Sequence, residues 1–264
     1  MLPRVAAYFQ KCNITALTYD PRTLGESDGH PRRDIDLAKH VSDLHDALTF
    51  LRQHVPLVHP EQIVYRGFSF NGVVALNAAA LDKRCRAVIA VSPLTDLSYP
   101  AEQLPVLFRD AMRDREAQLA GGRPKYVAVL QKDGTCPYGW GQGANMTEYE
   151  VAKKSAAVFP TYENEMSLQT HYRISVWRPY NLMPLVAPTL VMIVTPEKDR
   201  MSLPQKQKAL FDGFEGGPKE HVRIPERGHM DALTGPGFDA IMDQQIEFLR
   251  RHVELPLTGK KSSL

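Results

Sequence analysis

A serine set closely between glycines is the first residue of this sequence whose surroundings suggest chemistry. Ser69 lies in the stretch Gly67-Phe-Ser-Phe-Asn-Gly72, between two apolar runs. A strand that turns sharply into a helix at a serine needs small neighbours, and Gly67 and Gly72 meet that need. Asn71 stands where a third glycine is common, although asparagine tolerates unusual backbone angles better than most residues. The pattern predicts that Ser69 is a nucleophile and that the backbone amide of Phe70 donates to an oxyanion.

Two further side chains stand where a serine nucleophile needs its base and its acid. Asp199 follows an apolar run rich in valine, and His229 follows the next such run, with Gly228 before it. Hydrolases with this kind of turn present serine, acid and histidine in that chain order. The histidine would accept the serine proton while the aspartate holds the imidazole in the required tautomer. Glu197 is an alternative acid, and His229 as a surface histidine or Ser69 as an ordinary turn serine also stays open.

Bringing these distant side chains together requires a scaffold, which the apolar patterns describe. Helices repeat apolar residues every three or four positions, whereas buried parallel strands are short, continuous apolar runs. Strands are predicted at residues 14–19, 63–65, 87–91, 189–195 and 221–224, and helices at 3–12, 34–54, 73–81, 204–214 and 238–252. This alternation predicts an α/β fold with a mostly parallel sheet and helices on both faces.

The stretch between the third and fourth predicted strands breaks this alternation. Glycine-punctuated pieces with scattered aromatic residues replace the regular pattern there. We predict that residues 97–186 form an inserted cap or lid, and that residues 1–96 and 187–264 form the core. Aromatic side chains of the cap either line an acyl pocket or form the cap's own core. These residues are Trp140, Tyr149, Phe159, Tyr162 and Trp177.

Charge and cysteine content narrow the classes of partner. The formal net charge is only +2 and no basic tract stands out, so no nucleic acid is expected as a partner. Cys12, Cys85 and Cys136 are odd in number and lack metal-type spacing, which favours free thiols in a reducing compartment. No apolar run is long enough for a membrane span, and no signal peptide is recognisable. We expect no membrane partner, no metal or organic cofactor and a cytoplasmic location.

Beyond single motifs, long stretches of the sequence resemble one family. The stretch from Ile14 to Leu97, which contains YDPRTLGESDG and GFSFNG, carries the resemblance together with the later segment RGHMD. It is similar to the fungal α/β hydrolases often called the polyketide transferase family, distant relatives of dienelactone hydrolases and Xaa-Pro dipeptidyl-peptidases. The resemblance covers nearly the whole chain. It implies an α/β-hydrolase fold with an active site at Ser69, Asp199 and His229.

The same resemblance implies acyl chemistry in secondary metabolism. Members move or release acyl chains from carrier-protein thioesters, and some are linked to cyclisation of a released intermediate. The substrate expected here is a polyketide-type thioester or ester, either a small molecule or bound to a carrier protein. Members also have an N-terminal region ahead of the helix that opens this chain, and that region supplies the first strands and a second oxyanion amide. The resemblance therefore implies a sheet without its first strands, with a catalytically impaired scaffold as the alternative to an enzyme.

Overall fold

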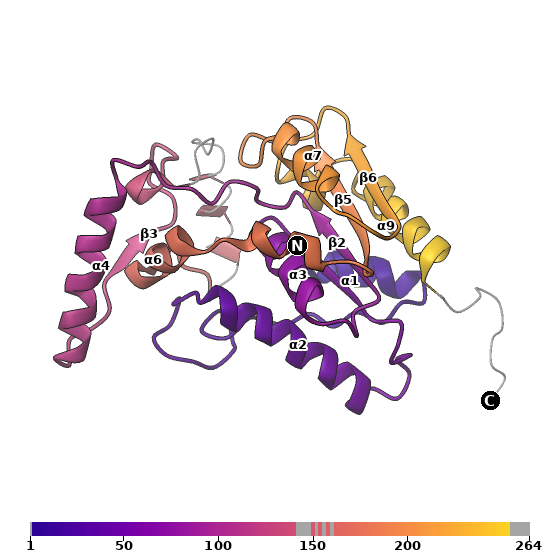
Figure 1. Ribbon diagram of the computed structural model, residues 1–264, viewed down its shortest axis with the longest axis horizontal. Helices are drawn as coiled ribbons and strands as arrows, with labels where there is room; N and C mark the ends of the chain where they lie inside the picture. The colour runs from indigo at the N-terminus through magenta and orange to yellow at the C-terminus, as the bar shows by residue number, and fades with distance from the viewer. Residues whose placement is uncertain (1, 141–148, 151–152, 155–156, 159–160, 254–264) are drawn as a thin grey trace. The chain divides into compact units, whose positions relative to one another are not determined.

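The computed structural model describes residues 2–140, 149–150, 153–154, 157–158 and 161–253, coloured along the chain in Figure 1. The chain forms two compact units. Unit 1 comprises Met1–Thr18, Leu44–Thr95 and Pro179–Leu264, and unit 2 comprises Tyr19–Asp43 and Asp96–Arg178. Unit 2 therefore differs from the cap predicted at residues 97–186, because it includes residues 19–43 and ends at Arg178.

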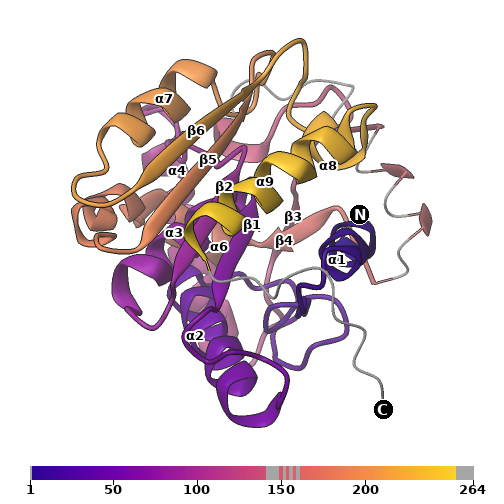
Figure 2. The same ribbon diagram turned by 90° about the vertical axis from the view of Figure 1, so that its right-hand side faces the viewer.

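A four-stranded parallel sheet forms the centre of unit 1 (Figures 1 and 2). The strands lie in the order β1 (Val64–Phe68), β2 (Ala87–Val91), β5 (Leu190–Pro196) and β6 (Lys219–Ile224). Every residue of β2 and β5 is buried, which explains why both strands read as continuous apolar runs. These four strands confirm the parallel sheet that the sequence predicts.

Helices cover both faces of this sheet. On one face, α3 (Phe70–Leu81) packs against β1 and β2, and it is buried along its whole length from Gly72 to Ala80. On the other face, alternate residues of β2 and β5 pack against α1 (Leu2–Lys11) and α9 (Phe238–His252), as Figure 2 shows for α9. Further helices of unit 1 are η2 (Pro179–Leu185), α7 (Pro204–Asp212) and α8 (Asp231–Thr234). The helix α2 (Leu37–His54) belongs to unit 1 from Leu44 onward.

One predicted strand is wrong. Residues 14–19 have no strand pairing, and most of them are exposed, with Leu17 at 41% of its full accessibility. A strand exists only where a neighbour pairs with its backbone N–H and C=O groups. Within the described residues, β1 is an edge strand that pairs only with β2, so no neighbour is in place for this segment. The apolar residues of this segment predicted a buried strand, but the segment pairs with no strand in the described residues and is mostly exposed.

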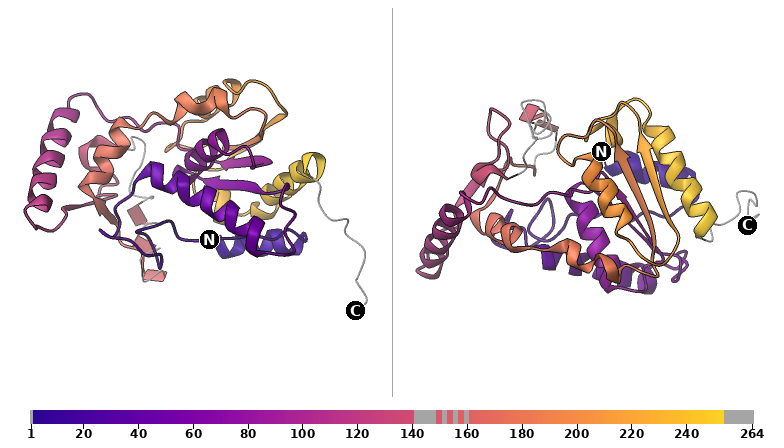
Figure 3. Two further views of the ribbon diagram at one scale, coloured as in Figure 1. Left: turned by 60° about the horizontal axis from the view of Figure 1, so that its bottom comes forward. Right: turned by 45° about the horizontal axis from the view of Figure 1, so that its top comes forward.

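Within the described residues, unit 2 includes a pair of packed helices and a small antiparallel sheet. The helix α4 (Leu104–Leu119), magenta in Figure 3, packs against α6 (Leu168–Val176). The strand β3 (Tyr126–Ala128) pairs with β4 (Glu165–Ser167), and η1 (Pro137–Gly139) follows β3 in the chain. This unit therefore has helix and strand contacts of its own.

Buried polar contacts fasten the pieces of unit 2 together. Asp114 on α4 accepts a hydrogen bond from the side-chain amide of Gln169 on α6 at 2.8 Å. Arg173, also on α6, donates to the carboxylate of Asp34 at 2.8 Å. The second contact attaches the segment 19–43 to α6, and this explains why that segment belongs to unit 2 rather than to the core.

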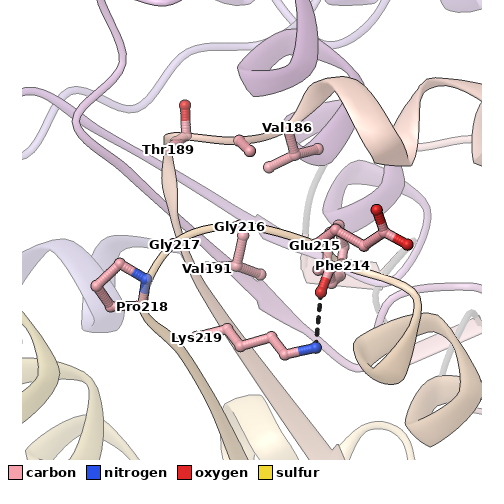
Figure 4. Close-up of a pocket in the computed structure, with 10 residues that line it drawn as sticks. Val186, Thr189, Val191, Phe214, Glu215, Gly216, Gly217, Pro218 and Lys219 are labelled. Atoms are coloured by element: carbon pink, nitrogen blue, oxygen red, sulfur yellow. Dashed lines mark hydrogen bonds between the residues drawn. The ribbon is translucent and has the colours of Figure 1, made fainter.

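A lysine holds the connection between α7 and β6 (Figure 4). Lys219 Nζ donates to the carbonyl oxygens of Phe211 at 3.0 Å and Phe214 at 2.7 Å, and it lies 4.8 Å from the centroid of the Phe211 ring. This cation satisfies carbonyl groups at the C-terminal end of α7, where the helix dipole favours positive charge. The adjoining pocket has a volume of about 10 Å³ and is lined by Val186, Ala187, Thr189, Val191 and residues 214–219. That is room for about one water molecule and not for a substrate.

Candidate active site

Ser69 lies at the tight turn between β1 and α3, in a backbone conformation that few serines adopt. Its φ is 53° and its ψ is −123°, a region that costs roughly 1–3 kcal/mol and needs surrounding support. The support is visible: the Ser69 amide donates to the carbonyl of Val91 at 2.9 Å, and its carbonyl accepts from the amide of Gly72 at 2.9 Å. A strained serine held between a strand and a helix is the local structure that the sequence predicts.

The small residue before the turn has a steric cause. A Cβ atom on Gly67 would lie 2.1 Å from the carbonyl oxygen of Asn71, so no side chain fits there. Asn71 itself lies exposed on α3 with ordinary helical geometry, and the departure from glycine at this position is therefore tolerated. Phe70 is the first residue of α3, so its backbone amide is one of the N-terminal amides of that helix.

The structure brings His229 and Asp199 to Ser69. His229 Nε2 lies 2.8 Å from Ser69 Oγ, and His229 Nδ1 lies 2.8 Å from Asp199 Oδ2. A carboxylate only accepts hydrogen bonds, so Nδ1 carries the proton and the Nε2 lone pair faces the serine hydroxyl. His229 and Asp199 are both buried, and the His229 ring centroid lies 5.0 Å from that of Phe68. All three side chains belong to unit 1.

The carboxylate of Asp199 is fixed from every side. Its Oδ1 accepts from the backbone amides of Met201 at 2.9 Å and Ser202 at 2.8 Å. Its Oδ2 accepts from the side-chain amide of Gln207 at 3.1 Å in addition to His229. These contacts leave the carboxylate one orientation, the orientation that directs the imidazole toward Ser69.

Glu197, the alternative acid, lies elsewhere. Its carboxylate pairs with the exposed Arg223 guanidinium at 2.7 Å, and none of its described contacts is with His229.

Residues 2–237, nearly nine-tenths of the chain, match the family model described as the alpha/beta hydrolase family. The chain belongs to the α/β hydrolase family. The predicted α/β-hydrolase fold is thereby confirmed.

Relatives of this α/β hydrolase include proteins named polyketide transferase and thiohydrolase. Polyketide transferase ATR5 of Stachybotrys chlorohalonatus is 44% identical over 253 residues, which cover 95% of this chain and 84% of that protein. A thiohydrolase of Eupenicillium brefeldianum is 42% identical over 249 residues, covering 93% and 80% of the two chains. The predicted resemblance to the polyketide transferase family is therefore confirmed.

Two solved structures extend the similarity to three dimensions. The α/β hydrolase GrgF from a Penicillium species superposes with a TM-score of 0.85 at 37% identity, covering 96% of this chain and 85% of GrgF. DcsB, solved in complex with its substrate analogue, gives a TM-score of 0.89 at 34% identity, with 96% and 86% coverage. The chain is an enzyme of the α/β-hydrolase kind, with relatives that are named as a transferase and a thiohydrolase.

Sequence reasoning missed the residues that hold the carboxylate of Asp199. Gln207 is fully buried on α7, where its side-chain oxygen accepts from Thr195 Oγ1 at 2.9 Å while its nitrogen donates to Asp199. His221 Nε2 lies 2.9 Å from the same Thr195 oxygen, and burial is the main cause that lowers the pKa of His221. The available signal was a glutamine on the inward face of an amphipathic helix, since buried amides need partners.

The aromatic residues of the predicted cap lie in different surroundings. Trp140, Tyr149 and Tyr162 pack against the buried side chains of Leu130 and Cys136 in a small cluster within unit 2. Trp177 is half-buried after α6, and Phe159 lies outside the described residues. The first three residues thus contribute to the interior of unit 2.

The described residues contain neither a metal-binding cluster nor a membrane-spanning helix. In the ranges given above, no group of three or more histidine, cysteine, aspartate or glutamate side chains is arranged to hold a metal ion. Across the same ranges, no helix combines the length and the apolar character that crossing a membrane requires.

Proposed function

We propose that this chain is a serine-dependent acyl hydrolase or acyltransferase that acts on a polyketide-type thioester or ester. In this proposal Ser69 is the nucleophile, His229 the general base and then acid, and Asp199 the group that orients the imidazole. The observation that carries the proposal is the pair of 2.8 Å contacts from His229, one to Ser69 and one to Asp199. The names of the relatives, polyketide transferase and thiohydrolase, support the choice of substrate class.

The first half of the reaction transfers the acyl group to the enzyme. Ser69 Oγ attacks the thioester carbonyl carbon while its proton passes to His229 Nε2. The carbonyl oxygen becomes an oxyanion, and the backbone amide of Phe70 at the start of α3 donates to it. When the carbon–sulfur bond breaks, the imidazolium returns its proton to the departing sulfur. The products are an acyl-Ser69 ester and a free thiol.

The second half regenerates the serine. A water, alcohol or amine acceptor loses a proton to His229 Nε2 as its oxygen or nitrogen attacks the Ser69 ester. A second oxyanion forms at the same place, and its collapse breaks the ester bond as His229 protonates Ser69 Oγ. Water as the acceptor gives an acid, an alcohol gives an ester, and an amine gives an amide.

A covalent probe tests the role of Ser69 directly. A fluorophosphonate should label Ser69 of the folded protein, and Ser69→Ala should abolish both the labelling and the release of thiol from acyl thioesters. Folded wild-type protein that neither reacts with the probe nor releases thiol would overturn the proposal. Product analysis with and without an added alcohol or amine then separates hydrolysis from transfer, because only transfer yields an ester or amide.

A further inference from the structure

A chain of hydrogen bonds runs from the half-buried side chain of His221 on β6 to the buried carboxylate of Asp199. His221 Nε2 lies 2.9 Å from Thr195 Oγ1, and Thr195 Oγ1 donates to Gln207 Oε1 at 2.9 Å. Gln207 Nε2 donates to Asp199 Oδ2 at 3.1 Å, and the same oxygen lies 2.8 Å from His229 Nδ1. All five residues belong to unit 1. The strands β5 and β6 and the helix α7 thus contribute one connected set of polar groups behind the imidazole.

A backbone carbonyl fixes the direction of this chain. The side-chain nitrogen of Gln207 also donates at 2.7 Å to the carbonyl oxygen of Ser202, which can only accept. The NH₂ group of Gln207 therefore faces two acceptors, this carbonyl and the Asp199 carboxylate, and its oxygen is left for Thr195. An amide oxygen carries no proton, so the Thr195 hydroxyl has to donate to it. That hydroxyl then accepts from His221, whose Nε2 has to carry a proton.

The inner part of the chain is removed from water. The side chains of Gln207, Thr195 and Asp199 are 0%, 1% and 2% exposed. A buried amide costs free energy unless its polar atoms have partners, and both polar atoms of Gln207 have them. Reversal of the amide would set its oxygen against the Ser202 carbonyl and the Asp199 carboxylate. The side chain of Gln207 therefore has one favourable orientation.

The outer end of the chain stays a donor whether the His221 ring is neutral or protonated. Burial is the main cause that lowers the pKa of His221 from its ordinary value of 6.5. The positive charges of Lys208 and Arg223 act in the same direction, whereas Asp212 opposes them. The ring is therefore mostly neutral at pH 7, and its one proton lies on Nε2, because Thr195 Oγ1 accepts there.

We propose that Gln207 is a positioning residue for Asp199, the acid of the proposed reaction, and that Thr195 and His221 fix the orientation in which Gln207 acts. The inference rests on the proposed function, since it concerns how the base of that reaction is held. By donating to Asp199 Oδ2, Gln207 fixes the oxygen that accepts from His229 Nδ1. Without this donor the carboxylate holds the imidazole less firmly in the alignment that proton transfer from the serine needs.

Two glutamines of α7 provide a matched pair of variants. Gln207→Met keeps the length of the side chain and removes its polar atoms. It should lower kcat about tenfold and leave KM within about twofold, because a fully buried amide does not contact substrate. Gln205 is exposed on the same helix, so Gln205→Met should keep the wild-type kcat. A Gln207→Met enzyme that is folded by urea unfolding and has either an unchanged kcat or a change in KM alone would overturn the inference.

Thr195 provides a second pair of variants, which keeps the inference testable if Gln207→Met does not fold. Thr195→Val removes the hydroxyl at nearly constant shape, so Gln207 Oε1 loses its donor and kcat should fall about threefold. Thr195→Ser keeps the hydroxyl and should restore the wild-type kcat. Equal losses in the two Thr195 variants would overturn the inference, because the loss would then come from packing and not from the hydrogen bond.

A tautomer measurement separates this inference from the proposed function. Nitrogen-15 NMR of histidine-labelled protein distinguishes the two neutral tautomers and needs no turnover. The His221 ring should carry its proton on Nε2 and the His229 ring on Nδ1, each signal being assigned by its loss in His221→Gln or His229→Gln. In Gln207→Met the His229 ring should become a mixture of tautomers, whereas Gln205→Met should leave it unchanged. These results in a protein that cleaves no thioester would support the chain although the proposed reaction had failed. A His221 ring protonated on Nδ1 would reverse the chain and overturn the inference, whether or not the enzyme is active.

Discussion

Replacement of Asp199 by asparagine tests how the imidazole is held. Two backbone amides, of Met201 and Ser202, donate to Oδ1 of Asp199, so the oxygen of an asparagine would take that place. Its NH₂ group would then face His229 Nδ1, 2.8 Å away in the native geometry. A donor in that place obliges Nδ1 to accept, and the imidazole proton moves to Nε2. Nε2 then faces Ser69 with a proton of its own and cannot take the serine proton.

The size of the effect follows from this tautomer change. Loss of the general base with the rest of the geometry intact lowers kcat/KM by about 10⁴, which is about 5.5 kcal/mol of transition-state stabilisation. Stability should change by only about 1 kcal/mol, because the side chain keeps its shape and loses mainly the hydrogen bond from Gln207. Thioester cleavage gives the rate, and urea unfolding gives the free energy of unfolding.

Glu197→Gln is the matched control for Asp199→Asn. Glu197 pairs with Arg223, whose side chain is 65% exposed, so neutralising it should change kcat/KM by less than about twofold. An Asp199→Asn enzyme that keeps more than about a tenth of wild-type activity would refute the reasoning. If Glu197→Gln were as impaired as Asp199→Asn, the role of the acid would have been assigned to the wrong residue.

Three further changes test other parts of the structure. Gly67→Ala places a Cβ atom 2.1 Å from a backbone oxygen and should lower the free energy of unfolding by more than about 3 kcal/mol. In the control Gly213→Ala, the new Cβ atom makes ordinary contacts at 3.5 Å, and the free energy of unfolding should change by less than about 0.5 kcal/mol. Equal urea midpoints for the two variants would contradict this prediction. Burial lowers the pKa of His171 to about 4 from an ordinary value of 6.5, so protonation favours the unfolded chain as pH falls through that window. The free energy of unfolding should therefore drop by about 3 kcal/mol more in wild type than in His171→Phe between about pH 7 and pH 4, and parallel curves would reject this. Lys219→Met should cost about 1–2 kcal/mol in urea unfolding because α7 loses its terminal cation, and an unchanged midpoint would contradict this.

The sequence predicted most of unit 1 because its local and tertiary requirements agree there. Residues 87–91 and 190–194 are apolar throughout, since both faces of those strands are covered, and such runs can be recognised without knowledge of their neighbours. The turn at Ser69 could also be predicted from local sequence, because the nearby backbone of α3 excludes a side chain at Gly67. The relative position of Ser69, Asp199 and His229 followed from chain order and from their places after strands.

What the sequence did not predict depends on partners distant in the chain. Residues 14–19 have the composition of a strand, but a strand also needs a paired neighbour, which composition does not reveal. Gln207 lies eight residues after the carboxylate that it supports, and its place on the inward face of a helix does not reveal which group it contacts.

The hydroxyl of Ser202 bears on how this enzyme can be recombined with its relatives. It donates to the carbonyl of Pro93 and contacts Thr95 Oγ1 at 2.9 Å, while the Ser202 amide donates to Asp199. Thr95 is the last residue of unit 1 before the chain enters unit 2. A chimera that takes residues 96–178 from another family member should therefore keep Pro93 to Thr95 with the recipient. A junction placed even three residues earlier would replace Pro93 and Thr95, which hold the loop that carries Asp199.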